Sequence, residues 1–382
     1  MMIKIVSSRI ADLVAPGISA IRPYEPGKPI EEVERELGIS DVVKLASNEN
    51  PLGPSPLAVA ALHAAVKNVH MYPDGASFRL RRRLAAKLDV RLEEVFVGNG
   101  SNEIIDLLVR TFCTPGLHDV LAPAHTFVCY SLAAYARGVE YREAARGPAF
   151  AYDVDALLAA VTPRTRVVFL ANPDNPTGVH MGARDLDRLV AELPAHVILA
   201  VDEAYSEYVR ATDGADLIPR RAERELMIVM RTFSKIYGLA GARCGYAVGS
   251  PELLGFLDRV RNPFNVSSLA QAAALAALDD DAHVTRSQRT NAEGMIELGA
   301  GLERLGVAFT PSQANFILVD TGGDARALFD RMLARGVIVR PVGGAYGLPR
   351  HLRVTVGTSD ENQRLLAALA AELHAGASHG KG

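Results

Sequence analysis

The 382-residue sequence has no tryptophan, only three cysteines and no excess of one charge. Cys113, Cys129 and Cys244 are odd in number and lack C-x-x-C spacing, which argues against a disulfide framework and a zinc site. Lysine and arginine total 41 against 44 aspartate and glutamate, a formal net charge of -3. Proteins that bind nucleic acids or anionic membranes usually carry basic regions, and this sequence has none. We therefore expect small-molecule partners, and neither nucleic acid nor membrane.

Long hydrophobic runs are absent as well. No stretch approaches the ~20 apolar residues that a membrane-spanning helix needs, and Lys4, Arg9 and Asp12 interrupt the apolar residues near the N-terminus. Together with the odd cysteines, this pattern predicts a cytoplasmic protein. At roughly 100–200 residues per domain, the length predicts two or three domains.

Between about residues 95 and 250, short apolar runs alternate with amphipathic stretches. The runs 95–97, 167–170, 197–201 and 227–230 are apolar on both faces, as buried strands of a parallel sheet are. Ile104, Ile105, Leu108, Val109 and Phe112 form one face of a helix that Ser101 or Asn102 could cap. The pattern predicts an α/β fold with a mostly parallel, doubly wound sheet.

The remainder of the chain predicts a smaller α+β domain. A helical stretch runs from after residue 263 to about 309, and 316–319, 337–339 and 352–356 are expected to be strands of a separate sheet. We therefore expect a large domain over 51–262. The small domain combines an N-terminal arm, 1–50, with 263–382.

Polar residues follow each predicted strand of the large domain. Ligands of open α/β sheets bind outside the carboxyl ends of the strands, so we expect these side chains to share one crevice. They are Ser101 and Asn102, then Asn175, then Asp202 and Tyr205, and finally Thr232, Ser234 and Lys235.

Lys235 is the only lysine between Lys87 and Lys381. Arginine stays protonated, whereas a desolvated lysine can lose its proton and form a Schiff base. Taken alone, Lys235 could equally be a surface lysine. The hydroxyls of Thr232 and Ser234 before it and Arg243 after it favour a site for an anionic cofactor.

The glycine turn at 98–100 and the carboxylate of Asp202 each allow two interpretations. The turn Gly98–Gly100 could be purely steric, or it could offer helix N-terminal amides to an anion. Asp202 could cap a helix or meet an arginine, or it could face a protonated pyridine nitrogen, as pyridoxal chemistry requires.

From about Tyr24 to Arg364, the sequence resembles the fold-type I pyridoxal-phosphate aminotransferases, and within them the histidinol-phosphate aminotransferase group. Six motifs carry the resemblance, in this order: LASNENP at 45–51, YPDG at 72–75, NPDNPTG at 172–178, DEAY at 202–205, SKIYGLAGARCG at 234–245 and LRVTVG at 352–357. Asp174 stands where the motif often has asparagine, and we expect no chemistry from it.

The resemblance implies a cofactor, pyridoxal 5'-phosphate, and a role for each matching residue. Lys235 would hold it as an aldimine and then move the proton between the substrate and the cofactor. Asp202 would bind the ring nitrogen, Asn175 and Tyr205 the ring oxygen, and Phe127 would stack on the ring, with Tyr130 as the alternative. The phosphate would bind Ser101, Asn102, Thr232, Ser234 and Arg243.

The resemblance also implies a homodimer and a substrate site. Tyr72 would reach the cofactor phosphate of the other subunit. Arg353 would hold the substrate's anionic group, and Arg340, Tyr24 and Asn50 would complete the substrate site. The expected reaction transfers an amino group from L-histidinol phosphate to 2-oxoglutarate in two half-reactions.

The residues argue against two other functions and leave two open. A nicotinamide oxidoreductase would need G-x-G-x-x-G, but Glu103 stands where the third glycine belongs. A non-catalytic binding protein would not need Lys235, Asp202 and Arg353 together. An aromatic amino acid aminotransferase and a pyridoxal-dependent decarboxylase of a phosphorylated amino acid stay open.

Overall fold

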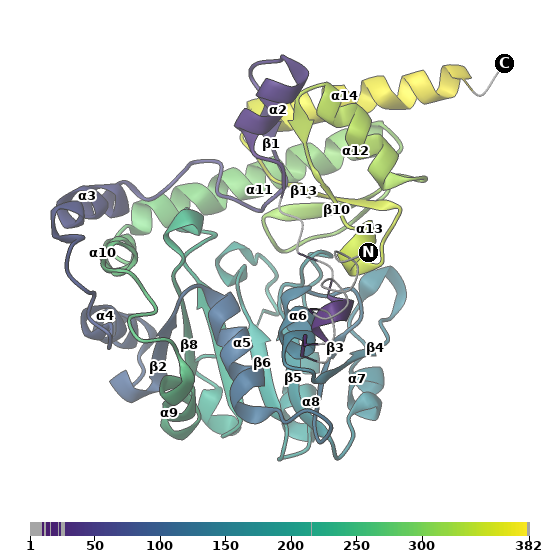
Figure 1. The fold of residues 1–382 in the computed structure, drawn as a ribbon. Helices are drawn as coiled ribbons and strands as arrows, with labels where there is room; N and C mark the ends of the chain where they lie inside the picture. The colour runs from purple at the N-terminus through teal and green to yellow at the C-terminus, as the bar shows by residue number, and fades with distance from the viewer. Residues whose placement is uncertain are drawn as a thin grey trace, which may run out of the picture.

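The computed structural model describes residues 10, 13–15, 17–21, 23, 27–214 and 216–379. Figure 1 shows two parts, a lower one around a large sheet and an upper one around a small sheet. The long helix α11 (Asp281–Arg304) extends from beside the lower part into the upper one (Figure 1).

The lower part contains a seven-stranded sheet in the order β2-β8-β7-β6-β5-β3-β4. Only the two pairs that β8 makes are antiparallel, so the predicted mostly parallel sheet is confirmed. The strands are β2 (Val95–Gly98), β3 (Asp119–Pro123), β4 (Glu140–Ala144), β5 (Thr165–Ala171), β6 (Ile198–Asp202), β7 (Met227–Thr232) and β8 (Gly245–Gly249).

Helices cover both faces of this sheet because successive side chains of a strand point to opposite faces. Val168 and Leu170 of β5 enter one hydrophobic cluster, whereas Val167 and Phe169 enter the other. The helices are α3 (Pro56–Ala65), α4 (Phe78–Leu88), α5 (Ser101–Phe112), α6 (Cys129–Ala136), α7 (Val154–Ala160), α8 (Ala183–Glu192), α9 (Pro251–Val260) and α10 (Ser268–Ala277).

The start of α5 corrects one expectation. Its N-cap is Gly100, at φ 74°, and no side chain caps the helix, so the prediction that Ser101 or Asn102 caps it is wrong. Both residues already belong to the first helical turn. The backbone N–H groups at this terminus are therefore left for another acceptor.

The upper part contains a four-stranded antiparallel sheet in the order β12-β13-β10-β9. Its strands are β9 (Phe309–Thr310), β10 (Phe316–Asp320), β12 (Arg340–Pro341) and β13 (His351–Thr355). The run at 337–339 was expected in this sheet, but β11 (Val337–Ile338) instead pairs in parallel with β1 (Val43–Lys44). Helices α2 (Ile30–Leu37), α12 (Ala325–Ala334), α13 (Gly343–Tyr346) and α14 (Ser359–His379) complete this part.

Short 3-10 helices occupy several connections, at Ile18–Ala20, Val66–Asn68, Leu92–Glu94, Pro148–Phe150, Ser206–Tyr208, Arg221–Glu223 and Ala240–Ala242. The helical stretch expected up to about residue 309 is two helices, because Asp280 caps α11 through the His283 amide. Helix α10 contributes Ala273 and Ala274 to the core of the lower part. The domain boundary at 262/263 stays a prediction, and the packing places α10 with the lower part.

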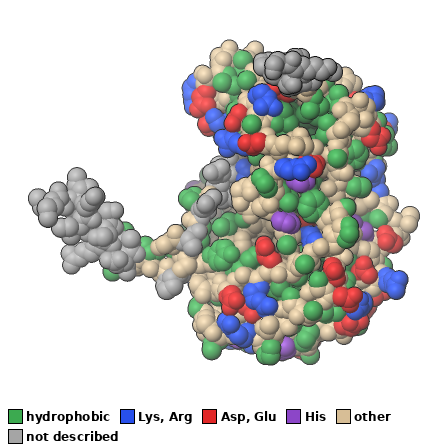
Figure 2. Space-filling view, turned by 90° about the vertical axis from the view of Figure 1, so that its right-hand side faces the viewer, with side chains coloured by type: hydrophobic (Ala, Val, Ile, Leu, Met, Phe, Trp, Pro, Cys, Tyr) green, Lys and Arg blue, Asp and Glu red, His purple; other side chains and the backbone are tan. Residues whose placement is uncertain are grey.

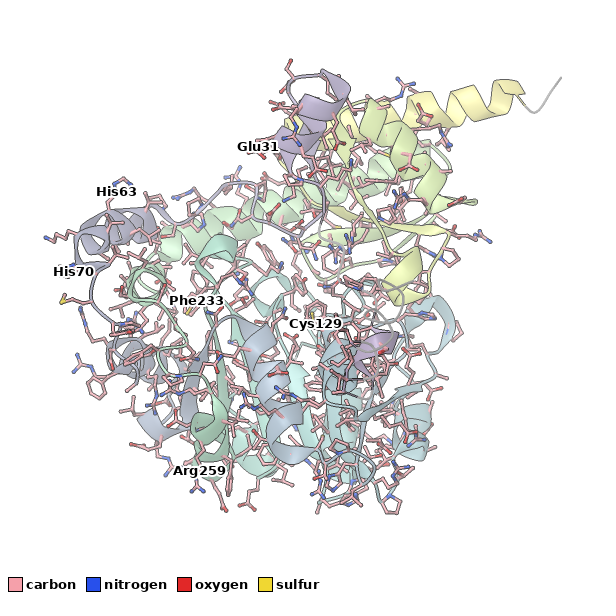
Figure 3. The ribbon with its side chains drawn as sticks, in the orientation of Figure 1. Glu31, His63, His70, Cys129, Phe233 and Arg259 are labelled. Carbon is pink, nitrogen blue, oxygen red and sulfur yellow. The ribbon has the colours of Figure 1, made fainter. Side chains whose placement is uncertain are left out.

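Figure 2 shows acidic and basic side chains interspersed over the face that it presents. Figure 3 places His63, on α3, and His70, shortly after it, at the periphery, and Cys129 near the junction of the two parts. Of the helices that the structure describes, none is both long enough and apolar enough to cross a membrane.

Candidate active site

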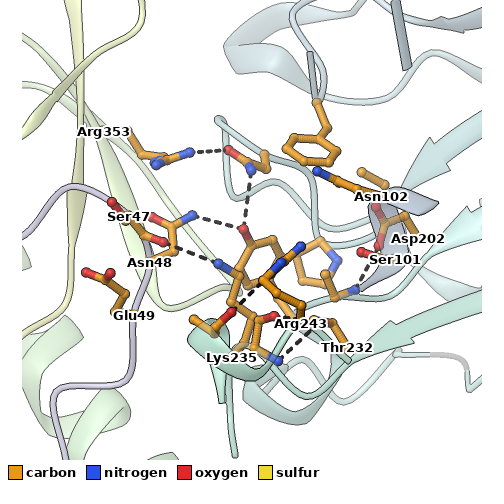
Figure 4. Close-up of a pocket in the computed structure, with 18 of the residues that line it drawn as sticks. Ser47, Asn48, Glu49, Ser101, Asn102, Asp202, Thr232, Lys235, Arg243 and Arg353 are labelled. Atoms are coloured by element: carbon orange, nitrogen blue, oxygen red, sulfur yellow. Dashed lines mark hydrogen bonds between the residues drawn. The ribbon is translucent and has the colours of Figure 1, made fainter. Parts of the chain in front are cut away.

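A cavity of about 260 Å³ lies at the carboxyl ends of the central strands, closed from the other side by the upper part (Figure 4). It is lined by Ser47, Asn48, Glu49, Ser101, Asn102, Phe127, Ala171, Pro173, Asn175, Asp202, Ala204, Tyr205, Thr232, Ser234, Lys235, Ala240, Arg243, Tyr346 and Arg353. The structure therefore brings together most of the predicted site residues. It does so by joining loops after β2, β5, β6 and β7 to the 47–49 segment and β13.

Lys235 follows β7 and directs its amine into this cavity (Figure 4). Its Nζ donates a hydrogen bond to the carbonyl of Ser47 at 3.3 Å and lies 5.7 Å from the centre of the Tyr205 ring. Burial, and next the positive charge of Arg353, lower the pKa of Lys235 to about 8. The neutral fraction of this amine near neutral pH is therefore larger than that of an ordinary lysine, which favours its action as a nucleophile.

Asp202 ends β6 and is buried, with 4% of its surface exposed. Its carboxylate accepts hydrogen bonds from the Tyr130 hydroxyl at 3.0 Å and from the Ala204 amide at 3.2 Å. Burial is the main cause that raises the pKa of Asp202 to about 6. A buried carboxylate that is held by a phenol and an amide favours a cationic ligand beside it.

Tyr205 lies between two amides. Its hydroxyl oxygen accepts hydrogen bonds from Asn48 Nδ2 at 2.9 Å and from Asn175 Nδ2 at 3.2 Å. Arg353 Nη1 in turn donates to Asn175 Oδ1 at 2.7 Å, and its Nη2 donates to the Ala46 carbonyl at 2.6 Å. This chain of hydrogen bonds connects the large sheet to the small one across the cavity.

Asn48 is a site residue that the sequence analysis did not identify, although it lies in the 45–51 motif. The predicted residue of that motif, Asn50, does not line the cavity. Its Nδ2 donates to the Ile236 carbonyl and to Ser287 Oγ, both at 2.8 Å. Since Asn48 has a positive φ of 55°, the chain turns there, and sequence spacing alone does not reveal which asparagine faces inward.

The N-terminus of α5 forms one corner of the cavity. Ser101 and Asn102 lie there beside Thr232, Ser234 and Arg243. A Cβ added at Gly100 would lie 2.6 Å from Arg243 Nη2, so the glycine lets the guanidinium pack against the helix terminus. Hydroxyls, uncapped amides and an arginine together form a donor set for a multiply charged anion.

The structure separates the two candidates for an aromatic face. Phe127 lines the cavity. Tyr130 is fully buried, stacks on Phe169 at 4.6 Å between ring centroids and contacts Asp202 through its hydroxyl. Phe127 is thus the one with a face available to a ligand.

Besides Asn50, two predicted residues lie outside the cavity lining, Tyr72 and Arg340. Tyr72 is 84% exposed and stacks on Phe264, at 4.7 Å between ring centroids. Arg340 lines a second cavity of about 650 Å³, which shares Tyr346 with the first. Tyr24 lies outside the described residues. Ser47, Glu49 and Tyr346 also line the cavity and were not predicted, although Ser47 and Glu49 belong to the recognised motif at 45–51.

The residues present fit pyridoxal phosphate. The α5 corner suits a phosphate dianion, the buried Asp202 suits a protonated ring nitrogen, and Lys235 offers the amine that binds an aldehyde. No group of three His, Cys, Asp or Glu side chains within the described part of the chain could hold a metal ion. Fold and cavity together define the pyridoxal-phosphate-dependent enzymes of fold type I.

Comparisons with known proteins agree. Residues 40–369 match the family model "Aminotransferase class I and II". A histidinol-phosphate aminotransferase of Anaeromyxobacter sp. is 52% identical over 358 residues, 94% of this chain and 98% of that protein. Histidinol-phosphate aminotransferase 2 of Pseudomonas aeruginosa is 48% identical over 359 residues, 94% of this chain and 96% of its own.

Among solved structures, the histidinol-phosphate aminotransferase of Sinorhizobium meliloti in complex with pyridoxal-5'-phosphate has a TM-score of 0.87 and 30% identity, covering 95% of this chain and 98% of that one. The chain belongs to the class I and II aminotransferase family, and it is a pyridoxal-phosphate-dependent aminotransferase. The decarboxylase alternative gains no support from these relatives.

Proposed function

We propose that this enzyme transfers the amino group of L-histidinol phosphate to 2-oxoglutarate, forming imidazole acetol phosphate and L-glutamate. Its relatives of 48–52% identity bear the name of that activity. The structural observation that carries the proposal is a pair of arginines. Arg340 of β12 and Arg353 of β13 are directly opposite each other in the antiparallel pair.

Like charges directly opposite on neighbouring strands repel each other, so a bound anion would stabilise this pair. Arg353 lines the cofactor cavity and Arg340 the adjoining one, and Tyr346 lines both. Arg353 Nε is also buried without a hydrogen-bond partner. We infer that this region receives the anionic end of the substrate, a phosphate in L-histidinol phosphate or a carboxylate in 2-oxoglutarate.

Five lining residues have a chemical task in this proposal. Pyridoxal phosphate, when bound, supplies an aldehyde for the amino group and an electron sink for the charge that develops at the substrate's α-carbon. Asp202 would hold a proton at the ring nitrogen, Asn175 and Tyr205 would bind the ring oxygen, and Phe127 would cover one ring face. The Lys235 amine would accept the proton that leaves the substrate's α-carbon.

An aromatic amino acid aminotransferase is the second candidate. The second cavity is lined in part by Val128, Leu132, Tyr135 and Phe329, which would suit an aromatic side chain. In that case Arg353 would hold the substrate carboxylate.

Single-turnover kinetics would distinguish the two. We would mix the pyridoxal-loaded enzyme with L-histidinol phosphate or with L-phenylalanine and follow conversion to the pyridoxamine absorbance. A preference of at least ~100-fold for the phosphate, about 2.7 kcal/mol, is expected. Equal or reversed rates would favour the aromatic activity.

We further propose a homodimer in which Tyr72 contacts the cofactor phosphate of the other subunit. Exposed apolar side chains gather around Tyr72. Val69 and Met71, 63% and 55% exposed, precede it in the sequence, and Phe264, 45% exposed, stacks on its ring. Such exposure is typical of a surface that a partner covers.

Mixing inactive Lys235→Ala with Tyr72→Ala subunits should restore up to about a quarter of the activity, since half the dimers would carry one intact site. No recovery would contradict shared sites.

We also propose a cytoplasmic location, which the three free cysteines support. Cell fractionation followed by immunoblotting would test it.

A further inference from the structure

A buried ion pair lies beside the cofactor cavity, and it includes Asp174, a position at which the sequence predicts no chemistry. Asp174 is completely buried, and its Oδ2 lies 2.9 Å from Arg146 Nη2, whose side chain is 4% exposed. Two hydroxyls donate to the same carboxylate, Thr126 to Oδ1 at 2.5 Å and Thr177 to Oδ2 at 2.6 Å. Every oxygen of this carboxylate is thus engaged.

The contacts join three loops at one edge of the sheet. Thr126 follows β3, Arg146 follows β4 and Asp174 follows β5, and the strand order β5-β3-β4 places β3 in the middle. Arg146 also donates from Nε to the carbonyl of Ala124 at 2.6 Å and from Nη1 to that of Phe150 at 3.0 Å. The ion pair therefore spans the loop after β3 from both sides.

The residues next to these contacts are those that face the cofactor. Phe127, which lines the cavity, directly follows Thr126. Asn175, which binds Tyr205 and Arg353, directly follows Asp174. We propose that Asp174 is a positioning residue that, with Arg146 and Thr126, holds Phe127 and Asn175 at the separation and orientation that the pyridine ring requires. The inference rests on the roles proposed above for Phe127 and Asn175.

Two isosteric variants test the link between the loops. Thr126→Val removes the hydroxyl that joins the β3 loop to Asp174, whereas Thr177→Val removes a hydroxyl that joins Asp174 only to its own turn. We expect Thr126→Val to raise the dissociation constant for pyridoxal phosphate at least ~5-fold and Thr177→Val less than ~2-fold, at similar losses of thermal stability. Fluorescence titration of the apoprotein measures both constants.

A spectroscopic readout separates positioning from plain stability. Since Asn175 and Tyr205 tune the cofactor's ring oxygen, Thr126→Val should also shift the pH midpoint of the visible band by about half a pH unit, and Thr177→Val should not. Equal effects of the two variants, or no effect of Thr126→Val on either readout, would overturn the proposal.

Asp174→Asn tests the ion pair itself, because it leaves Arg146 buried without its counter-charge. We expect at least ~10-fold weaker cofactor binding. The matched control is Glu94→Gln, which removes the bidentate pair with Arg221 at 3.0 and 3.1 Å, away from the cavity lining. Equal weakening in the control would overturn the proposal, and if Asp174→Asn does not fold, the threonine pair decides. These readouts involve no amino donor, so failure of the histidinol-phosphate proposal would leave them unchanged.

Discussion

The lower part contains two pairs of oppositely charged residues, Asp174 with Arg146 and Lys235 with Asp202. The charges contact each other in the first pair but not in the second. Asp174 and Arg146 are in direct contact. Threonine hydroxyls donate further hydrogen bonds to the carboxylate, and backbone carbonyls accept hydrogen bonds from the guanidinium. Lys235 and Asp202 share the cavity, yet each is held by neutral groups, a carbonyl for the amine and a phenol and an amide for the carboxylate.

Burial shifts the second pair toward neutrality, lowering the pKa of Lys235 to about 8 and raising that of Asp202 to about 6. A paired buried charge holds loops in place, whereas a buried charge without a counter-ion is available for a ligand. The first pair is therefore structural, and the second has the properties of a ligand site. Four predictions test this distinction.

The largest effect is expected at Lys235. Lys235→Arg keeps the positive charge but removes the nucleophilic amine, so the turnover number should fall at least ~1,000-fold and the absorbance band of the Schiff base should give way to that of the free aldehyde. Absorbance scans and stopped-flow turnover measure the two effects. Lys87→Arg, at a lysine that pairs with Asp281 at 2.9 Å, is the control and should behave as the parent. A surviving Schiff-base band in Lys235→Arg would disprove the role.

Asp202→Asn should have the next largest effect. The amide cannot stabilise a proton on the ring nitrogen, so we expect a loss of ~100-fold or more in turnover. Tyr130→Phe is the matched variant, because it removes the 3.0 Å hydrogen bond but leaves the carboxylate, and it should cost ~10-fold or less. Steady-state kinetics at saturating substrate would decide, and near-normal turnover in Asp202→Asn would contradict the assignment.

Arg353→Lys should mainly weaken substrate binding. The lysine loses the fork that reaches Asn175 and an anionic substrate together, so KM should rise ~10–100-fold with a smaller change in turnover. Arg350→Lys, which alters a largely exposed arginine paired with Asp320 at 3.0 Å, should leave KM unchanged. A similar rise in both variants would point to a general charge effect.

The smallest effect concerns stability and pH. The pKa of Lys235 is about 8 in the folded apoprotein against an ordinary value of 10.5, so between these values the unfolded chain binds more protons. The free energy of unfolding of the apoprotein should therefore gain from this residue as pH rises from 8 to 10.5, and the gain is lost as pH falls through the same window. Lys235→Met should show a flatter profile in urea titrations at pH 8, 9 and 10. Parallel profiles would show that the pKa is not lowered.

Sequence patterns predicted four of the seven strands of the large sheet, β2, β5, β6 and β7, because these are apolar on both faces. They did not predict β3, β4 and β8, and β4 carries polar residues such as Glu140 and Arg142. Sequence patterns also did not predict which strands pair when the two strands are far apart in the sequence. The run at 337–339 is equally apolar, but nothing in it specifies that β11 pairs with β1 across almost 300 residues. Asp280 was a readable signal that the helical stretch is broken, since aspartate favours the N-cap.

The cofactor chemistry of this protein was predicted from the amino-acid sequence, through its resemblance to the fold-type I aminotransferases. Asp202, Lys235 and Asn175 stand in short motifs at or just after strand ends, and such motifs are recognisable without the fold. Three features required the fold: Asn48 rather than Asn50 lines the cavity, Phe127 rather than Tyr130 lines it, and Arg340 lies opposite Arg353. Those choices depend on backbone turns, burial and strand register, which arise only when distant segments pack together.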